Sequence, residues 1–556
     1  MIAERSDFES LAAFGAAVTV VGSGPVGLAL ALRLAGRGVR VLVLESGGHT
    51  ASAAARSLSE AENLLPENHH APETAVARRL GGTSNLWGGR CLPFDAIDHA
   101  PRPWLRGEDG AALPAWPIGP ETLAPWLGEA CRFLDAGDPV FTEPLPGVRA
   151  VVGADRSFGF ESLERWASDP RSQRVHAAAL AGSPDLCVAL GATVTGLEVA
   201  GGRVAALRLH LEGAGAGRLA VRKLVLAAGG NESTRLLLAT QRDHGDLFGG
   251  RDGPLGRSYM GHLNGQVADI ILDNEALHAG LDYHVDGHGS YVRRRIVPAP
   301  EVQAAARLPN VAFWPVVPEV YDAAHRSGPL SAVFLALSVK AVGGRLLAEP
   351  IRLKHVGPPP HDRLAHLRNV IRDLPRTFAF APAFLWRNRV ARPRLPGFFL
   401  QNPARRYGLE YHAEQLPDPE SRLTLGEETD RLGLPRLRIR LAFSEADAAG
   451  VLRAHEALEA WLLRHGLGRL DWRHPPEARV AAVLREAKHG THQIGTIRMG
   501  TDRSQAVVDA DCRSFDLDNL HVVTTAVLPT SGQANPTLTA VQLALRLADH
   551  LAPRAA

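Results

Sequence analysis

Two histidines and an asparagine near the C-terminal end of the chain carry side chains that could do proton chemistry. His489 and His492 border or occupy the glycine-rich run Gly490 to Gly500, and Asn535 follows later. The unperturbed pKa of histidine is about 6.5, so either imidazole could accept a proton near neutral pH. An asparagine amide stays neutral, but it can donate a hydrogen bond to an oxygen that is becoming negative. Taken alone, a histidine among glycines is more often structural, so catalysis requires a binding site beside it.

A glycine-rich turn near the start of the chain predicts such a binding site. Residues 18–46 have the pattern of a buried strand, a turn, an apolar helix and a second buried strand. The turn carries Gly22, Gly24 and Gly27 in the spacing G-x-G-x-x-G, in the context that dinucleotide binding requires. The first glycine allows the tight turn, the second lets backbone N–H groups approach a pyrophosphate, and the third lets the helix pack on the strand. Glu45 ends the second strand, where a carboxylate can accept from a ribose hydroxyl, so we expect a bound dinucleotide.

A second glycine-rich stretch, RLGGTSNLWGGR at residues 79–90, has the composition of a ligand-binding loop. Four glycines and two hydroxyl side chains in so short a span do not build a core, but their backbone N–H groups can face a ligand. An ordinary surface turn is the alternative on these residues alone.

Together, these stretches resemble the glucose-methanol-choline (GMC) oxidoreductases, which are FAD-dependent enzymes that oxidise alcohols. Residues 79–90 are similar to the second flavin-binding motif of that family, and His492 begins a close match to its H-x-x-G-T-x-R-M-G motif. Some members attach the flavin covalently through a histidine in the first of these two motifs. Asn85 and Leu86 stand there in this chain, and His99 lies in a different setting, so the resemblance implies non-covalent FAD.

The resemblance also implies roles for the C-terminal side chains. His492 takes the position of the active-site histidine, and Asn535 takes the second position of the catalytic pair, where members carry histidine or asparagine. We expect neutral His492 to accept the hydroxyl proton, so that activity falls at low pH, while Asn535 donates to the substrate oxygen. His489 is the rival base and is otherwise structural. Pro536 and Thr537 are expected to bring backbone groups to the flavin.

Further cofactor contacts follow from the same resemblance. Val194, on an expected strand over residues 193–199, corresponds to a position whose backbone contacts the adenine. Ala228 and Gly229 follow an expected strand over residues 223–226, at the edge of the sheet where ligands bind. A helix cap through Ser233 is the alternative at this turn, and both can hold. The expected cofactor-binding residues are Gly22, Gly24, Pro25, Val26, Gly27, Glu45, Ser46, Arg79, Gly81, Gly82, Thr83, Asn85, Leu86, Trp87, Gly88, Val194, Ala228, Gly229, Pro536 and Thr537.

Composition excludes several classes of protein. The chain has 61 Lys or Arg against 59 Asp or Glu, which gives no reason to expect a nucleic-acid partner. Four scattered cysteines without a C-x-x-C argue against a disulfide framework, a zinc site and a redox dithiol, so we expect no metal. They fit a reducing compartment. The N-terminus lacks the pattern of a signal peptide, and no long apolar run indicates a membrane span, so we expect a cytoplasmic protein.

The chain length favours two domains or one elaborated domain. We expect an α/β fold in which a Rossmann-like FAD-binding domain carries a second, mixed-sheet substrate domain. The FAD-binding domain is expected to be discontinuous, over residues 1–105, 190–264 and 486–556, and the substrate-binding domain and cover to comprise residues 106–189 and 265–485. Within the latter, the pattern predicts strands over residues 267–272, 291–297, 311–317 and 332–340 and an amphipathic helix over residues 444–465.

The segment 352–394 stands out because it is strongly basic and contains several aromatic residues between Phe378 and Trp386. Contact with a membrane surface or a redox partner is one interpretation. A solvated helix pair with a buried cover over the active site is the favoured one.

The sequence therefore predicts oxidation of a primary or secondary alcohol to the aldehyde or ketone, with a sugar, glycoside or polyol as the favoured substrate. A non-sugar alcohol and a reaction like that of the family's hydroxynitrile lyases are the alternatives. A second dinucleotide fingerprint is lacking, which disfavours an NAD(P)H-using flavoprotein, and the intact His492 and Asn535 disfavour a binding protein without activity. Oxygen or a separate electron acceptor would complete the cycle. Candidate polar groups for the substrate are Gln401, Asn402, Tyr411, His412 and Glu414.

Overall fold

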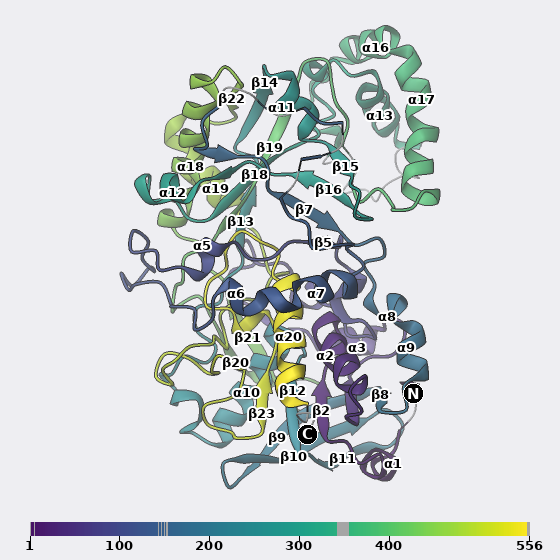
Figure 1. Cartoon of the computed structure of the whole chain (residues 1–556), viewed down its shortest axis with the longest axis vertical. Coiled ribbons are helices and arrows are strands. Elements are labelled where there is room, and N and C mark those ends of the chain that lie inside the picture. The colour runs from purple at the N-terminus through teal and green to yellow at the C-terminus, as the bar shows by residue number, and fades with distance from the viewer. Residues whose placement is uncertain are drawn as a thin grey trace.

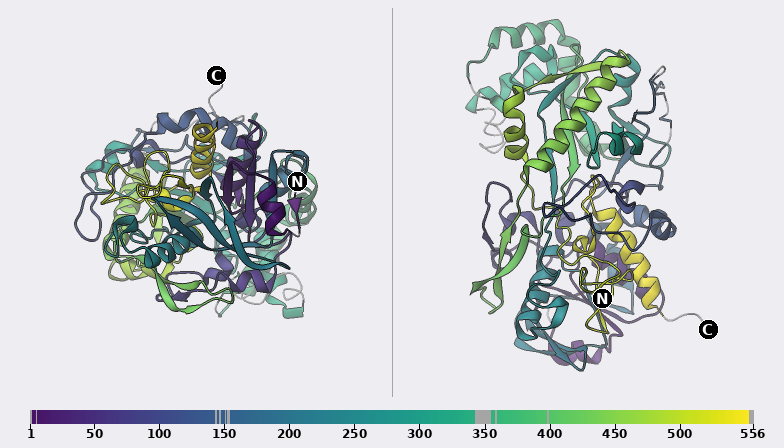
Figure 2. Two further views of the ribbon diagram at one scale, coloured as in Figure 1. Left: turned by 90° about the horizontal axis from the view of Figure 1, so that it is seen from below. Right: turned by 90° about the vertical axis from the view of Figure 1, so that its left-hand side faces the viewer.

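The computed structural model has two parts stacked along its long axis (Figures 1 and 2). It describes residues 2–552, except residues 5, 143, 146, 150, 152, 153, 358 and 398 and the segment 342–354. The lower part in Figure 1 holds a parallel sheet, and the upper part holds an antiparallel sheet with helices packed on it.

A six-stranded parallel sheet forms the centre of the lower part. Strands β2, β3 and β8 are buried along their whole length, as expected for a parallel sheet covered on both faces. The expected Rossmann-like sheet is confirmed, and its strands come from widely separated parts of the sequence. In spatial order they are β1 (Ile2–Ala3), β8 (Leu186–Leu190), β3 (Val41–Glu45), β2 (Val18–Val21), β12 (Lys223–Leu226) and β23 (Leu520–Val522).

Helix α2 (Pro25–Ala35) begins directly at the glycine turn after β2. Its N-cap is Gly24, which has no side chain to bond the first N–H groups of the helix. The apolar residues of α2 are buried against β2, β3, β8 and the last helix, α20 (Thr537–Leu551). Arg33 Nε donates to Asp549 Oδ1 at 2.8 Å, so an ion pair also joins α2 to α20.

The turn after β12 differs from one of the two interpretations of the sequence. Helix α10 (Gly230–Asp243) begins one residue after Gly229, which is its N-cap and has a φ of 79°. Ser233 therefore lies inside the helix and caps nothing; it is fully buried. A left-handed φ at the cap favours glycine, which explains why no serine takes that place.

The upper part is built on a five-stranded antiparallel sheet. Every pairing in it is antiparallel, so the expectation of a mixed sheet is corrected. Helices α18 (Glu445–Arg464) and α19 (Arg479–Glu486) pack against it and bury Trp461. The strands are β13 (His262–Gly265), β19 (Arg406–Glu414), β14 (Ala268–Leu272) and β22 (Gly468–Trp472), with β18 (Val311–Val316) on the other edge of β19.

One expected strand is a helix. The sequence predicts a strand over residues 332–340, but α13 (Gly328–Ser338) occupies this place. Ser327 Oγ caps the helix by accepting from Leu330 N–H, and Pro329 lies in its first turn, both of which are helix-start signals. Two further helices, α16 (Arg363–Arg372) and α17 (Leu374–Leu385), follow, so the expected helix pair is confirmed. The expected buried cover is corrected, because Phe378 and Trp386 of this segment are exposed. Residues 352–354 and 358 of that prediction lie outside the described residues.

The predicted division into domains does not follow the sheets everywhere. β8 belongs to the parallel sheet, although residues 106–189 were assigned to the substrate domain. A small sheet of β20 (Arg422–Thr429), β21 (Pro435–Arg440) and β4 (Glu62–Asn63) joins residues from both predicted domains. The exact boundaries stay a prediction.

The other described elements are short or peripheral. The antiparallel strands are β9 (Ala192–Ala200), β10 (Arg203–Leu211), β11 (Gly215–Ala220), β5 (Arg90–Cys91), β7 (Leu163–Trp166), β15 (Tyr283–Val285), β16 (Tyr291–Arg294), β6 (Phe158–Gly159) and β17 (Val297–Pro298). The helices are α1 (Phe8–Ala13), α3 (Ala53–Ser57), α4 (Pro72–Ala75), α5 (Ala96–His99), α6 (Pro120–Leu123), α7 (Leu127–Phe133), α8 (Ser172–Val175), α9 (Ala177–Gly182), α11 (Glu275–Gly280) and α12 (Pro300–Ala305). Among the described residues, no helix combines the length and the apolar content that a membrane crossing needs.

Candidate functional site

A cavity of about 730 Å³ opens at the carboxyl ends of β2, β3 and β12. This is the edge at which parallel sheets of this kind bind ligands, and the volume is in the range of cofactor sites. The N-terminus of α2 and the loop after Gly81 form part of its wall.

Most of the side chains that the sequence predicts for the site line this cavity. They are Gly22, Gly24, Pro25, Val26, Glu45, Ser46, Gly82, Thr83, Leu86, Trp87, Gly88, Val194, Ala228, Gly229, Thr537, His492 and Asn535. The structure therefore brings together residues from the first, middle and last thirds of the sequence.

Five other predicted residues do not line the cavity, and two of them, Asn85 and Gly27, shape its glycine loops. Asn85 Nδ2 donates to the carbonyl oxygens of Leu80 and Gly82, which closes the second glycine loop on itself. A Cβ on Gly27 would lie 2.1 Å from Gly22 O, so this glycine is needed for the turn to fit. The five residues are Gly27, Arg79, Gly81, Asn85 and Pro536.

The two glycine loops leave room for a phosphate group. A Cβ on Gly24 or Gly88 would meet no protein atom within 4 Å, and both residues face the cavity. A Cβ on Gly82 would lie 2.8 Å from Gly24 Cα, so the two loops touch beside this space. The first N–H groups of α2 have no side-chain cap and carry the positive end of the helix dipole. This cradle fits the pyrophosphate of FAD.

Glu45 is held rigidly at the far end of the fingerprint. Its Oε2 accepts from Ser23 N–H at 3.1 Å and from Ser23 Oγ at 2.6 Å, and its Oε1 accepts from Gly47 N–H at 2.8 Å. A carboxylate offers about four acceptor positions, so one remains for a ribose hydroxyl.

The sequence did not indicate a charged network that forms another side of the cavity. Arg78 contacts Glu232 Oε2 at 2.5 Å, and Arg235 contacts the same oxygen at 3.5 Å and Asp430 Oδ2 at 2.9 Å. Although burial raises the pKa of Glu232, the two arginines hold it below its usual range. Arg78 neighbours the predicted loop, but Asp430 carries no local motif, so only folding shows that it belongs here.

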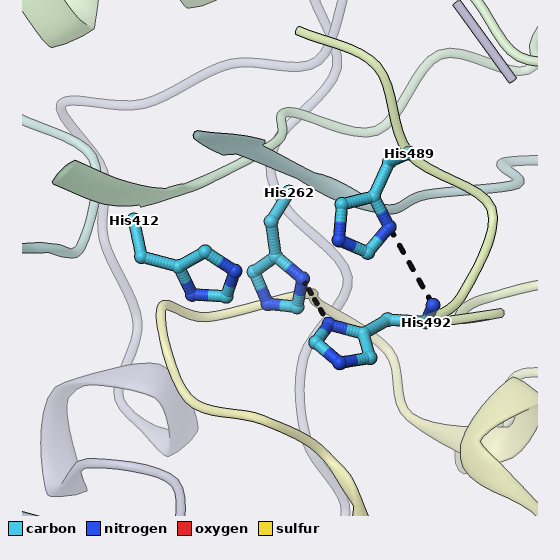
Figure 3. A group of neighbouring side chains, drawn as sticks. All are labelled: His262, His412, His489 and His492. Atoms are coloured by element: carbon cyan, nitrogen blue, oxygen red, sulfur yellow. Dashed lines mark hydrogen bonds between the residues drawn. The ribbon is translucent and has the colours of Figure 1, made fainter. Parts of the chain in front are cut away.

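At the opposite end of the cavity, His492 and Asn535 face each other. Asn535 Nδ2 lies 3.2 Å from His492 Nε2, and both residues line the cavity. Figure 3 shows that His492 belongs to a group of four imidazoles with His262, His412 and His489. The sequence analysis did not select His262, which begins strand β13 outside any motif.

A chain of hydrogen bonds assigns the tautomers of two of these rings. His262 Nε2 lies 3.1 Å from Ser531 O, and a carbonyl can only accept, so Nε2 carries the proton. Neutral His262 then presents a lone pair at Nδ1, which lies 2.9 Å from His492 Nδ1 (Figure 3). His492 must therefore donate from Nδ1, and its Nε2 is left as a lone pair that faces Asn535 and the cavity.

The electrostatics keep these rings neutral. Loss of hydration lowers the pKa of His492 well below its ordinary range, and the neighbouring His262 and the charge of Arg90 add to this effect. Burial and the His412 ring likewise lower the pKa of His262. Arg90 lines the cavity, its guanidinium pairs with Glu164, and its Cζ lies 4.2 Å from the ring centroid of Trp314. Neutral His492 is the form that can accept a proton.

His489 takes a different place from His492. It does not line the cavity, and its Nδ1 lies 3.5 Å from the backbone N–H of His492. One ring nitrogen from each of the four imidazoles lies within 4.8 Å of the others, a spacing that a metal ion could bridge. The lone pair on His262 Nδ1 is already used in the hydrogen bond with His492 Nδ1, so this pair needs no metal ion. The positive charge of nearby Arg90 also acts against binding of a cation.

None of the five polar side chains suggested for the substrate lines the cavity. Asn402 bonds the backbone of Arg406, and Glu414 pairs with Arg102, so both stabilise the fold. Gln401, Tyr411 and His412 also lie outside the wall, whereas Arg90 lies in it.

Two family descriptions match the chain. The family described as "FAD dependent oxidoreductase" matches residues 17–297, just over half of the chain, and "GMC oxidoreductase" matches residues 417–544. The first match contains both glycine loops, and the second contains His492 and Asn535.

Curated relatives match short stretches. A 2-methyl-1,2-propanediol dehydrogenase of Mycolicibacterium austroafricanum is 33% identical over 146 residues, which is 25% of this chain and 24% of that protein. A C-glycoside 3-oxidase of Microbacterium trichothecenolyticum is 32% identical over 126 residues, 22% of this chain and 23% of that protein. The fructose dehydrogenase large subunit of Gluconobacter japonicus is 30% identical over 146 residues, 26% of this chain and 25% of that protein. The matched stretches thus span about a quarter of each relative.

Solved structures match over almost the whole chain. Pyridoxine 4-oxidase from Mesorbium loti has a TM-score of 0.53 at 19% identity and covers 96% of this chain and 99% of its own. A fungal aryl-alcohol oxidase has a TM-score of 0.50 at 14% identity, with 96% and 98% covered. At such low identity the likeness shows the fold. Because the first of the two family descriptions matches more than half of the chain, the chain belongs to the FAD dependent oxidoreductase family, and its residues 417–544 match the GMC oxidoreductase description.

Proposed function

We propose that the protein oxidises an alcohol to an aldehyde or ketone, with His492 Nε2 as the base. The observation that carries this proposal is the pair formed by His492 Nε2 and Asn535 Nδ2, 3.2 Å apart in the wall of the cavity. A carbinol oxygen that replaces this contact, within hydrogen-bond distance of both nitrogens, would donate its proton to the lone pair of His492 and accept a hydrogen bond from Asn535. FAD, when bound in the cavity, supplies the acceptor for the hydride from the carbinol carbon.

In this proposal His262 is a positioning residue for His492. Its Nδ1 lone pair holds the proton of His492 on Nδ1, so that Nε2 is free to accept another. When His492 takes up the substrate proton it becomes an imidazolium, which keeps its hydrogen bond to His262. The lowered pKa of His492 makes it a weaker base but keeps it unprotonated at mildly acidic pH.

We infer that the substrate carries several oxygens, as a sugar, glycoside or polyol does. Arg90 Nη2 is buried in the wall without a hydrogen-bond partner among the described residues, and so is Asn535 Oδ1. Buried polar atoms without partners are costly, so a ligand that offers oxygens and hydroxyls would satisfy them. The names of the three curated relatives, which act on a diol, a C-glycoside and fructose, support the same class.

The cofactor contacts implied by the sequence are part of the proposal. The cradle of Gly24, Gly82 and α2 would hold the pyrophosphate, and Glu45 the ribose. His99 lies outside the wall, where its Nδ1 bonds Ile118 O, and the histidine that lines the cavity in the described part of the chain is His492. We therefore infer non-covalent FAD, with oxygen or a separate protein as the final electron acceptor.

Anaerobic bleaching of the flavin colour tests the proposed reaction. Purified holoprotein is mixed without oxygen with a panel of sugars, glycosides, polyols and simple alcohols. We expect bleaching by at least one polyhydroxy compound, and His492→Ala should slow it at least about 100-fold, the usual contribution of a general base. His210→Ala, on strand β10 away from the cavity, is the control for loss of an imidazole.

Three results would contradict parts of this proposal. Near-normal bleaching in His492→Ala with full FAD content would remove His492 as the base. Bleaching by simple alcohols alone would overturn the substrate class. A flavin that stays yellow while the substrate is consumed would favour a lyase on the same scaffold.

A further inference from the structure

Helix α16 buries polar side chains and exposes apolar ones, which is the reverse of an ordinary surface helix. Its buried side chains are polar, His366 and Asn369, whereas Leu364, Leu367 and Ile371 are 58%, 47% and 64% exposed. These three leucine and isoleucine residues are spaced i, i+3 and i+7, so they form one apolar stripe along the outer face. A surface helix in contact with water normally has the opposite arrangement.

The inward polar face of α16 is fixed by specific hydrogen bonds. His366 Nδ1 lies 3.0 Å from Ser331 Oγ of α13, and its Nε2 lies 3.1 Å from Tyr321 O. Asn369 Nδ2 donates to Ala323 O at 2.9 Å. Because these polar contacts fix which face of α16 is buried, the apolar stripe is held on the outward face.

The apolar surface continues onto α17 and the residues after it. Leu374 is 44%, Phe378 75%, Trp386 62% and Val390 55% exposed. Seven of the twelve large apolar side chains that are exposed in the described part of the chain lie between Leu364 and Val390. We call this set, Leu364, Leu367, Ile371, Leu374, Phe378, Trp386 and Val390, the apolar face. Figure 1 shows α16 and α17 at a corner of the upper part, away from the parallel sheet.

The charges around the apolar face are mostly positive. Residues 362–394 contain eight arginines and two acidic residues, Asp362 and Asp373. Asp362 is exposed and caps the start of α16. Asp373 is turned inward, where its Oδ2 accepts from Gly328 N–H at 3.3 Å. Arg368, Arg372 and Arg376 are exposed on the same helices as the apolar stripe. Exposed apolar side chains among arginines match a surface that is apolar inside and anionic at its boundary.

We propose that the apolar face docks the protein onto a membrane surface that contains anionic phospholipid. The leucine, phenylalanine and tryptophan side chains enter the boundary between headgroups and acyl chains, while the arginines bind the phosphates. Trp386, with an apolar ring and a polar N–H, suits this boundary. The protein would lie on the bilayer through this corner, with the cofactor cavity in its other part.

Vesicle co-sedimentation of the full holoprotein tests the proposal. Vesicles of phosphatidylcholine alone are compared with vesicles in which a third of the lipid is phosphatidylglycerol, at low and high salt. We expect binding to the anionic vesicles that weakens with salt, because each arginine near such a surface contributes about fivefold in affinity. Brominated lipid should quench tryptophan fluorescence, and Trp386→Phe should remove most of that quenching.

Matched variants locate the binding surface. Leu367→Ser combined with Phe378→Ser should lower vesicle binding at least about tenfold. Leu463→Ser, at a 59% exposed leucine on α18, is the apolar control and should leave binding unchanged. Arg372→Gln should lower affinity for anionic vesicles, whereas Arg485→Gln on α19 should not. Each variant is used only if its thermal midpoint matches that of the parent.

Other outcomes would overturn the proposal. Absence of binding to any vesicle would do so, as would binding that is the same in the double variant and the parent. A dimer in solution that Leu367→Ser with Phe378→Ser converts to a monomer would show that a second copy of the chain covers the apolar face. None of these outcomes depends on whether the enzyme oxidises an alcohol.

Discussion

His492 can act as a base only if its Nε2 carries a lone pair, and the hydrogen bond with His262 keeps the proton of His492 on Nδ1 instead. If His262→Phe removes the Nδ1 acceptor, His492 can move its proton to Nε2 and lose the free lone pair there. We expect kcat/KM to fall by between about tenfold and a hundredfold, less than the full effect of a general base. His262→Gln should retain most activity, because its amide can accept from His492 and donate to Ser531 O.

The pH profile separates this positioning role from a structural one. The His262 ring helps to lower the pKa of His492, so His262→Phe should move the acid limb of kcat/KM to higher pH at unchanged FAD content. A profile that keeps its shape while FAD is lost would indicate only damage to the fold. Loss of parent activity on chelation, together with stoichiometric bound metal, would show that the imidazoles hold a metal instead.

At the residue scale, sequence patterns found the two side chains that face each other but missed the residue that orients them. His492 and Asn535 stand in recognisable segments, and the structure places their side-chain nitrogens 3.2 Å apart. His262 has no motif, and its tautomer depends on Ser531 O, which only the folded chain brings within 3.1 Å. The five suggested substrate residues do not line the cavity, because polarity alone does not show which side chains a cavity meets.

At the scale of elements, alanine substitutions at two glycines of one turn should have different effects: one on apoprotein stability, the other on FAD binding. Gly27→Ala would place a Cβ 2.1 Å from Gly22 O, so we expect the free energy of unfolding of the apoprotein to fall by roughly 1–3 kcal/mol. Gly24→Ala meets no protein atom within 4 Å but points into the cavity. It should leave apoprotein stability unchanged and weaken FAD binding, measured as the flavin-to-protein absorbance ratio after dialysis.

Equal FAD content in Gly24→Ala and the parent would show that the pyrophosphate does not lie against this residue. A Gly27→Ala apoprotein with parental stability would show that α2 can shift away from the turn.

Elements with a clear hydrophobic period could be predicted from the sequence. Elements whose identity depends on the residues at their ends could not. The fingerprint unit and α18 have strong patterns and occur where expected. The strand expected over residues 332–340 is part of α13, because Ser327 and Pro329 start a helix before the apolar run begins. Sheet type in the upper part also escaped prediction, since pairing partners such as β14 and β22 are far apart in sequence.

At the scale of the whole molecule, buried neutral histidines make stability depend on pH. Burial lowers the pKa of His69, His455 and His521 to about 4, so the folded chain binds fewer protons than the unfolded chain below pH 6.5. The stability that these three histidines contribute is therefore complete above that pH and is lost as the pH falls. Each such histidine contributes roughly 1.4 kcal/mol of loss per pH unit between 6.5 and 4. The thermal midpoint should decrease steadily between pH 7 and pH 5.

His455→Gln tests this linkage at one site. His455 is fully buried and its Nδ1 donates to Val451 O at 2.8 Å. The variant should be less stable at pH 7 but lose stability less steeply on acidification, and His210→Gln controls for removal of a histidine. Parallel pH profiles for parent and His455→Gln would contradict the proposed protonation of the buried ring.

Strand β23 and helix α20 also determine when the lower part of the molecule can finish folding during synthesis. β23 pairs with β12 at the edge of the parallel sheet, and α20 covers the apolar side of α2. A nascent chain on the ribosome thus carries an unpaired edge of β12 and an open apolar side of α2 until β23 and α20 emerge. Asn535 and Thr537 belong to the cavity wall, so the complete cofactor site forms only after this segment has emerged from the ribosome. Until then, the exposed strand edge and the open apolar helix side favour aggregation of the growing chain.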